Sequence, residues 1–281
     1  MPEFGYAPVN GLQMYWESRG AGGVPLVVSH GGFGTTAMFG DLLDELAANR
    51  RVIAIELQGH GHTADIERAF SYEAFGDDIA GLVAHLGLGQ VDLLGYSLGA
   101  GASLRSAIAH PALVRRLVCA CAPCRREGWF PDVLDAMALV GAGLLEQMRG
   151  SALFEAWARV TPDVDAIPIV MDKMGALLRR PYDYSAEVAR LPMPALLVFG
   201  DADSVPPAHA AEFFALLGGG LRDGGWDGSM VGSSRLAILP GRTHYDVCSA
   251  PELGAAVERF LASPSSQPSR NVTEASSRRP A

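Results

Sequence analysis

Six short apolar runs, separated by longer segments of helical period, limit the folds open to this chain. The runs cover residues 25–30, 51–56, 91–95, 116–119, 195–199 and 235–239. Their nearly continuous aliphatic content is typical of strands that are buried on both faces of a parallel sheet. Strands that alternate with helices predict an α/β protein with a mostly parallel central sheet and helices on both faces.

Helices are expected between these strands. Ser71 is a candidate N-cap for a helix whose apolar residues recur at three- and four-residue steps as far as Leu86. Further helices are predicted over residues 98–110, 207–217 and 251–261.

Residues 125–190 interrupt the alternation, because this segment has no convincing strand and joins helical pieces rich in Met, Trp and Leu. We interpret it as a helical lid inserted into a core made of residues 1–124 and 191–262. Some apolar side chains must line the cavity under a lid, although most such side chains simply pack. The candidate substrate-binding residues are Phe33, Trp129 and Met137.

Two polar or glycine-rich stretches lie outside this pattern. Residues 218–232 form a glycine-rich loop to which the sequence assigns no function. Residues 263–281 are rich in Ser, Pro and Arg and contain too few apolar residues to pack, so we expect a disordered tail.

Charge and hydropathy exclude several classes of partner. The 281 residues carry a formal net charge of -9, whereas binding to a phosphate backbone needs clustered Lys and Arg. No apolar stretch has the length of a membrane span, and the N-terminus lacks the pattern of a secretion signal. We therefore expect a cytoplasmic protein that binds a small molecule, and the sequence does not predict an oligomeric state.

The cysteines and two neighbouring histidines raise the question of a metal. Cys119, Cys121 and Cys124 stand close together, but no second ligand pair follows at the spacing of a zinc site. We interpret them as free, buried thiols. His60 and His62 have no nearby carboxylate cluster and are interpreted as turn residues. No metal and no organic cofactor is expected.

The strongest chemical signal is Gly95-Tyr-Ser-Leu-Gly99, directly after one predicted strand and directly before a predicted helix. A G-x-S-x-G motif in this context is typical of a sharp turn that exposes a nucleophilic serine. Glycines are needed because the turn brings backbone segments too close for larger side chains. Ser97 is therefore the candidate nucleophile.

A serine hydroxyl needs a base to take its proton and an acid to orient that base. His244 follows the last predicted strand and is the candidate base. Asp201 and Asp203 both follow the preceding strand and compete for the role of the acid.

These motifs resemble the α/β-hydrolase family, especially its lactonase-like and non-haem haloperoxidase-like esterases. In that family a G-D-x-D pattern followed by proline usually places the acid at the second aspartate, so the resemblance favours Asp203. The loop Glu56-Leu-Gln-Gly-His-Gly-His-Thr63 resembles the family's D-x-R-G-x-G-x-S loop, with Glu, Gln and Thr replacing Asp, Arg and Ser. These departures affect no catalytic group.

The resemblance also implies an oxyanion hole made of two backbone N–H groups. One comes from Leu98, the residue after the nucleophile, and the other from the loop Ser29-His-Gly-Gly-Phe-Gly34. The second donor is expected at Gly32, with Phe33 as the alternative. Loss of one such donor is expected to cost about 3 kcal/mol of transition-state stabilisation.

The leading hypothesis is a serine hydrolase that acts on a carboxylic ester or lactone of a small, fairly apolar substrate. A C–C bond hydrolase or an acyltransferase could use the same triad. A catalytically silent binding protein on the same scaffold is the non-enzyme alternative.

Gly32-Phe-Gly-Thr-Thr-Ala37 with Glu56 also fits a dinucleotide-binding fingerprint, but that interpretation leaves Ser97, Asp203 and His244 unexplained.

Overall fold

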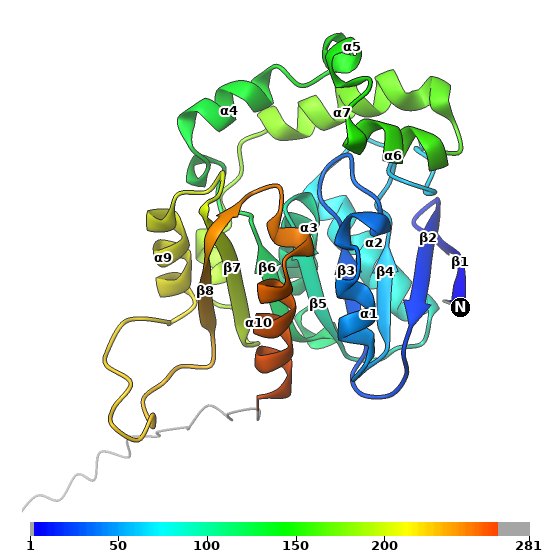
Figure 1. The fold of residues 1–281 in the computed structure, drawn as a ribbon. Coiled ribbons are helices and arrows are strands. Elements are labelled where there is room, and N and C mark those ends of the chain that lie inside the picture. Colours follow the sequence, from blue (N-terminus) through cyan, green and yellow to red (C-terminus); the bar gives the residue numbers. More distant parts are fainter. Residues whose placement is uncertain (1–2, 264–281) are drawn as a thin grey trace, which may run out of the picture.

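A single eight-stranded sheet runs through the molecule in the order β1-β2-β4-β3-β5-β6-β7-β8 (Figure 1). The computed structural model describes residues 3–263. β1 and β2 pair antiparallel, β2 pairs antiparallel with β4, and the remaining pairs are parallel. The strands are β1 (Glu3–Val9), β2 (Leu12–Arg19), β3 (Leu26–Ser29), β4 (Val52–Ile55), β5 (Val91–Tyr96), β6 (Val114–Ala120), β7 (Ala195–Ala202) and β8 (Arg235–Thr243).

Helices cover both faces of the sheet, as predicted. α1 (Leu42–Ala47) and α10 (Pro251–Ala262) lie on one face, and α2 (Tyr72–His85) and α3 (Leu98–Ala109) lie on the other (Figure 1). The remaining helices are α4 (Pro131–Ala138), α5 (Leu145–Met148), α6 (Ala152–Val160), α7 (Ile167–Arg179), α8 (Ser185–Val188) and α9 (Pro207–Leu216). Short 3₁₀ helices occupy Thr36–Phe39, Pro111–Leu113, Arg126–Gly128, Ala142–Leu144, Val164–Ala166 and Val247–Ser249.

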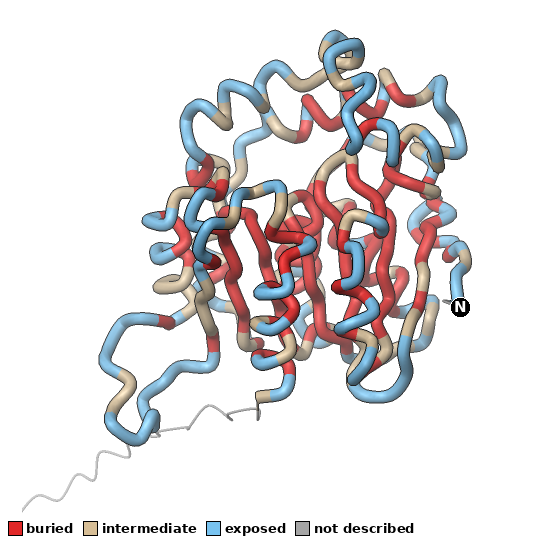
Figure 2. The backbone as a smooth tube through the Cα atoms, viewed as in Figure 1, coloured by how far each residue is buried: buried red, intermediate tan, exposed pale blue. Residues whose placement is uncertain are grey.

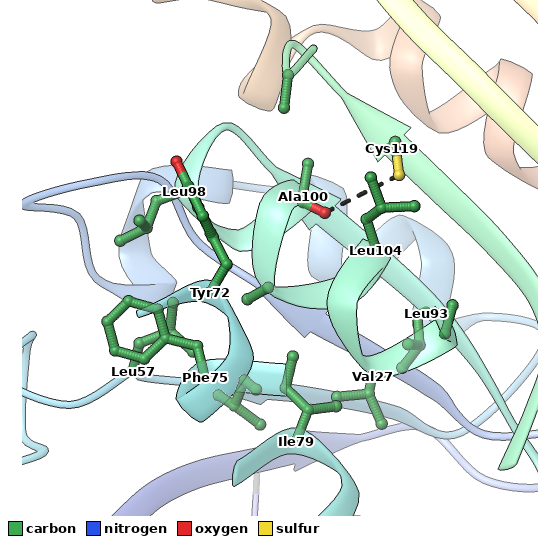
Figure 3. Close-up of a cluster of buried hydrophobic side chains, with 14 of the residues drawn as sticks. Val27, Leu57, Tyr72, Phe75, Ile79, Leu93, Leu98, Ala100, Leu104 and Cys119 are labelled. Carbon is green, nitrogen blue, oxygen red and sulfur yellow. Dashed lines mark hydrogen bonds between the residues drawn. The ribbon is translucent and has the colours of Figure 1, made fainter. Parts of the chain in front are cut away.

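Two apolar layers hold these elements together, one on each face of the sheet. Successive strand side chains point to opposite faces, so Val27 enters the layer under α2 and α3 while Leu26 and Val28 enter the layer under α1 and α10. Figure 2 shows the buried strands between exposed helix surfaces, and Figure 3 shows the first layer packed around Ile79 and Leu104. Burying one such aliphatic side chain contributes about 1.5–3 kcal/mol.

Residues 125–190 form a helical segment between β6 and β7 that lies across the carboxyl ends of the strands (Figure 1). Two side chains of this segment form hydrogen bonds to the loop after β4. Lys173 Nζ lies 2.6 Å from both Asp65 Oδ2 and the carbonyl oxygen of Ile66, and Trp157 Nε1 donates to the carbonyl oxygen of Gly59 at 3.2 Å. These contacts hold α6 and α7 above the sheet edge where the motif residues meet.

Some elements differ from the expectations. β1, β2 and α1 were not predicted, and the predicted strands and helices are displaced by one or a few residues at their ends. Residues 264–281 of the predicted tail lie outside the described residues. Within residues 3–263, no helix has the length and apolar content that a membrane crossing needs.

Candidate active site

Ser97 lies at a tight turn between β5 and α3, where its backbone adopts φ 53° and ψ -114°. A non-glycine residue with positive φ is strained. The flanking glycines allow this turn, because a Cβ on Gly95 would lie 2.2 Å from the carbonyl oxygen of Gly99. A Cβ on Gly99 would lie 2.4 Å from the carbonyl oxygen of Ser29. Glycine is therefore needed at both positions because a side chain there would collide with backbone carbonyl oxygens, as predicted.

Three predicted side chains meet in one hydrogen-bonded chain. Ser97 Oγ lies 3.0 Å from His244 Nε2, and His244 Nδ1 lies 2.9 Å from Asp203 Oδ1. The parallel strands β5, β7 and β8 bring these residues together because their carboxyl ends share one sheet edge. Asp201, the competing acid, instead accepts a hydrogen bond from the backbone N–H of Gly241 at 2.8 Å.

Asp203 is buried and surrounded by donors. Its carboxylate accepts hydrogen bonds from the backbone N–H groups of Gly200 (3.2 Å) and Val205 (3.3 Å) as well as from His244. Burial by itself would raise the pKa of Asp203, but the hydrogen bond and charge of His244 and the Gly200 N–H hold this pKa below its usual value. Asp203 therefore stays ionised and can orient the His244 ring.

The loop after β3 lies directly against Ser97. A Cβ on Gly31 would lie 3.4 Å from Ser97 Cβ, and a Cβ on Gly32 would meet the Met174 methyl group at 3.7 Å. Within residues 3–263, none of the N–H groups of Gly32, Phe33 and Leu98 donates a hydrogen bond to another protein group. The hydrogen bonds therefore leave Leu98 free and do not choose between Gly32 and the alternative, Phe33.

Two buried histidines, His30 and His60, pack next to this loop. His30 Nε2 accepts from the Leu57 N–H at 3.1 Å, and its Nδ1 lies 2.7 Å from the Gly31 carbonyl oxygen. The His60 ring lies 5.1 Å from the His30 ring. Burial lowers the pKa of His30 to about 3, with a further contribution from His60, and burial lowers the pKa of His60 to about 4. Both rings are therefore neutral packing groups near pH 7.

The three candidate substrate-binding residues occupy different places. The Trp129 ring is buried and lies 5.6 Å from the His244 ring. Phe33 follows Gly32, and its half-buried ring lies 5.6 Å from that of Trp157. Met137 is half-buried on α4 of the inserted segment. Trp129 therefore contacts the hydrogen-bonded chain, while Phe33 lies in the loop after β3.

The alternative ligand sites have structural roles instead. Glu56 is fully buried and accepts from the backbone N–H groups of Thr36 (3.0 Å) and His62 (2.6 Å), so it is not free to bind a ribose. This contact argues against the dinucleotide interpretation. His62 Nδ1 also lies 2.9 Å from Glu56, and the predicted turn role of this loop agrees with these contacts.

The neighbouring cysteines point apart. Cys119 Sγ lies 3.9 Å from the Ala100 carbonyl oxygen, and Cys124 Sγ lies 3.8 Å from His209 Nε2. Only Cys121 belongs to the metal-like grouping found within residues 3–263, in which ligand atoms of Cys121, Asp203 and His244 lie within 4.8 Å of one another. Burial raises the pKa of the Cys121 thiol well above its usual value, and a neutral thiol is a poor metal ligand.

Tyr96, the second residue of the G-x-S-x-G motif, was not predicted as a site residue. Its buried phenol donates a hydrogen bond to the backbone carbonyl oxygen of His244. A buried tyrosine needs a partner for its hydroxyl group, and this requirement was the available signal. The partner itself is 148 residues away along the chain, so the sequence does not identify it.

The fold and the site together define a class of enzyme. Residues 24–167 match the family model described as alpha/beta hydrolase fold. The chain belongs to the alpha/beta hydrolase fold family and is a hydrolase.

Relatives of the chain include proteins named as a hydrolase and as an esterase. The 2-(acetamidomethylene)succinate hydrolase of Mesorhizobium japonicum is 32% identical over 152 residues, which are 54% of this chain and 55% of the relative. The chain thus spans about half the length of that relative. A pimeloyl-(acyl-carrier protein) methyl ester esterase of Neisseria meningitidis is 31% identical over 251 residues, 82% of this chain and 89% of the relative. The crystal structure of an E-2-(acetamidomethylene)succinate hydrolase superposes with a TM-score of 0.73 at 22% identity, covering 94% of this chain and all of that one (100%), and it supports the fold alone.

Proposed function

We propose that this hydrolase cleaves a carboxylic ester or lactone of a small, fairly apolar substrate through an acyl-enzyme on Ser97. The observation that carries the proposal is the continuous hydrogen-bonded chain from Ser97 through His244 to Asp203 at a strained turn. A serine, a neutral imidazole and a buried carboxylate in this order are the groups that nucleophilic acyl transfer needs.

In the proposed reaction, His244 Nε2 removes the hydroxyl proton as Ser97 Oγ attacks the carbonyl carbon. Asp203 holds Nδ1–H and stabilises the imidazolium that forms. The N–H groups of Gly32 and Leu98 donate to the oxyanion. Collapse of the tetrahedral intermediate breaks the bond to the leaving alkoxide, which takes the proton from His244. Water then attacks the acyl-enzyme with the same proton transfers and releases the acid and free Ser97.

The apolar surroundings of the site support a small, apolar acyl or ring portion. Met174, which is buried on α7, brings its methyl group next to Gly32, and Phe33 and Trp129 supply aromatic surface nearby. We propose that residues 125–190 act as a lid that contributes such walls. The relative that aligns over most of its length is named a methyl ester esterase, which favours an ester substrate. C–C bond hydrolysis or acyl transfer on the same triad remains the second candidate, because both reactions use the same groups.

A chain-length panel of p-nitrophenyl esters, hydrolysed by wild type and Ser97→Ala, tests the proposal. Loss of several orders of magnitude in kcat/KM for the variant is expected. Ser233→Ala, which changes an exposed serine far along the chain, is the matched control and should retain wild-type rates. Equal activity of Ser97→Ala and wild type would exclude Ser97 as the nucleophile. A wild type that cleaves none of the esters would favour the C–C or binding alternatives.

A further inference from the structure

His244 directly follows β8, between two exposed residues. The neighbouring Thr243 and Tyr245 are exposed, and the loop follows the last strand at the edge of the sheet. Three aromatic rings lie near the imidazole: Tyr96 at 5.6 Å, Trp129 at 5.6 Å and Tyr245 at 5.4 Å between ring centroids. Tyr245 is 81% exposed, so Tyr96 and Trp129 are the buried rings that can restrict the imidazole.

Trp129 is itself fixed from several directions. Its Nε1 donates to the Tyr182 hydroxyl at 3.3 Å, and the next residue, Phe130, donates its backbone N–H to the carbonyl oxygen of Ser204 at 3.1 Å. Ser204 directly follows Asp203. Arg126, at the start of the same segment, donates its N–H to the carbonyl oxygen of Tyr182 at 2.9 Å. Trp129 is therefore tied to the loop of the acid and to both ends of the inserted segment.

The Trp129 and Tyr96 rings are oriented so that both pack against the His244 imidazole. The Trp129 and His244 rings are inclined at 67°, an edge-to-face arrangement that is favourable between aromatic groups. Tyr96 contacts the same imidazole at 34° and comes from β5, whereas Trp129 comes from the segment between β6 and β7. The two rings thus reach His244 from different elements.

We infer that Trp129 is a positioning residue that holds the His244 imidazole in line with Ser97 and Asp203, in addition to any surface it offers to substrate. This inference rests on the proposed function and deepens it. Displacement of a catalytic group by about 1 Å can cost up to about a hundredfold in rate. A ring that keeps the imidazole in place therefore affects mainly kcat. A residue that only lined a substrate pocket would act mainly on KM and on chain-length preference.

The test compares Trp129→Leu with Phe130→Leu, which makes the same kind of change one residue further along, at a partly exposed ring. We expect kcat for p-nitrophenyl acetate to fall by about tenfold or more in Trp129→Leu with KM nearly unchanged. Phe130→Leu should change kcat by less than about twofold. Trp129→Phe, which keeps an aromatic ring but loses the Nε1 donor, should recover most of the rate.

A second measurement does not depend on hydrolysis. The proton shared by His244 Nδ1 and Asp203 gives a downfield NMR resonance, which should broaden or disappear in Trp129→Leu and persist in Phe130→Leu. An unchanged kcat and resonance in Trp129→Leu, with a higher KM or a shifted chain-length optimum, would overturn the inference in favour of a substrate wall.

Two outcomes need separate treatment. If Trp129→Leu does not fold, Trp129→Met takes its place: a lower kcat at nearly constant KM, recovered in Trp129→Phe, supports the inference, and a wild-type kcat in Trp129→Met overturns it. If no ester is cleaved by the wild type, the proposed function fails, but the resonance still tests whether Trp129 holds His244.

Discussion

The hydroxyl group of Tyr96 donates a hydrogen bond to the backbone carbonyl oxygen of His244, so the residue before Ser97 holds the loop that carries His244. Burial raises the pKa of Tyr96 far above its usual value, and the phenol therefore remains protonated, and a donor, near neutral pH. One end of β5 thus positions two members of the hydrogen-bonded chain.

Replacing Tyr96 with Phe removes this donor and keeps the ring. The His244 carbonyl oxygen then loses its partner, and the loop after β8 gains freedom. We expect kcat to fall by about tenfold with little change in KM, because geometry and not substrate binding is altered. Tyr245→Phe is the control, since Tyr245 is exposed. Equal kcat values for the two variants would contradict this role of Tyr96.

Gly99→Ala should destabilise the whole fold. Its new Cβ would lie 2.4 Å from the Ser29 carbonyl oxygen and 2.6 Å from that of His30, and neither backbone atom can move without shifting β3. We expect a loss of about 3 kcal/mol in the free energy of unfolding, measured by urea denaturation. Gly143→Ala, where no atom lies within 4 Å of the new Cβ, should change it by less than about 0.5 kcal/mol. Similar losses for both variants would refute the contact argument.

Lys173 is the single lysine of the chain and fastens α7 to the loop after β4. Lys173→Met removes the hydrogen bonds to Asp65 and Ile66 and leaves the largely buried Asp65 carboxylate with Gln58 as its remaining partner. We expect local destabilisation of about 2 kcal/mol, seen as faster hydrogen exchange in α7. Arg149→Met, at an exposed ion pair, serves as the control. Unchanged exchange in α7 would show that Lys173 does not hold the segment.

Acid should weaken the fold through His30 and His60. Both have a pKa near 6.5 when unfolded, but about 3 and about 4 in the folded protein, so the unfolded chain binds more protons in between. The contribution of the two neutral histidines to the free energy of unfolding is fully present above about pH 6.5. It is lost as pH falls towards 4 for His60 and 3 for His30.

The effect of His60 can be measured separately. Between pH 7 and pH 4, His60 should lower the free energy of unfolding by on the order of 3 kcal/mol. His60→Gln should flatten the curve of urea midpoint against pH, whereas His85→Gln, at an exposed position, should not. A His60→Gln curve parallel to that of the wild type would contradict this assignment.

The parallel sheet and the tight turn at Ser97 could be predicted because each depends on residues that are adjacent in the sequence. Strands such as β3 and β5 are buried on both faces and read as continuous apolar runs, and the Gly95 and Gly99 motif stands at a strand end. β1 was not predicted because it is an edge strand with exposed Phe4 and Tyr6 and an internal proline. α1 has six residues and no side-chain cap, so its pattern is too short to recognise.

The arrangement around His244 could not be predicted, because it depends on contacts between distant residues. The family resemblance favoured Asp203 over Asp201, and the hydrogen bonds agree with that choice. The partners of Tyr96 and Trp129 lie 148 and 53 residues away, and no periodicity encodes such pairs. Trp129 was predicted as a substrate residue, and its contact with the His244 ring is visible only in the structure.

The central claim is that Ser97 forms a covalent acyl-enzyme with the help of His244. The most direct test treats wild type with a small fluorophosphonate, which reacts with activated serines, and locates the adduct by peptide mass spectrometry. We expect one adduct, on Ser97, which forms much more slowly in His244→Ala and is absent in Ser97→Ala. An adduct elsewhere, or no adduct in an enzyme that still hydrolyses esters, would contradict it.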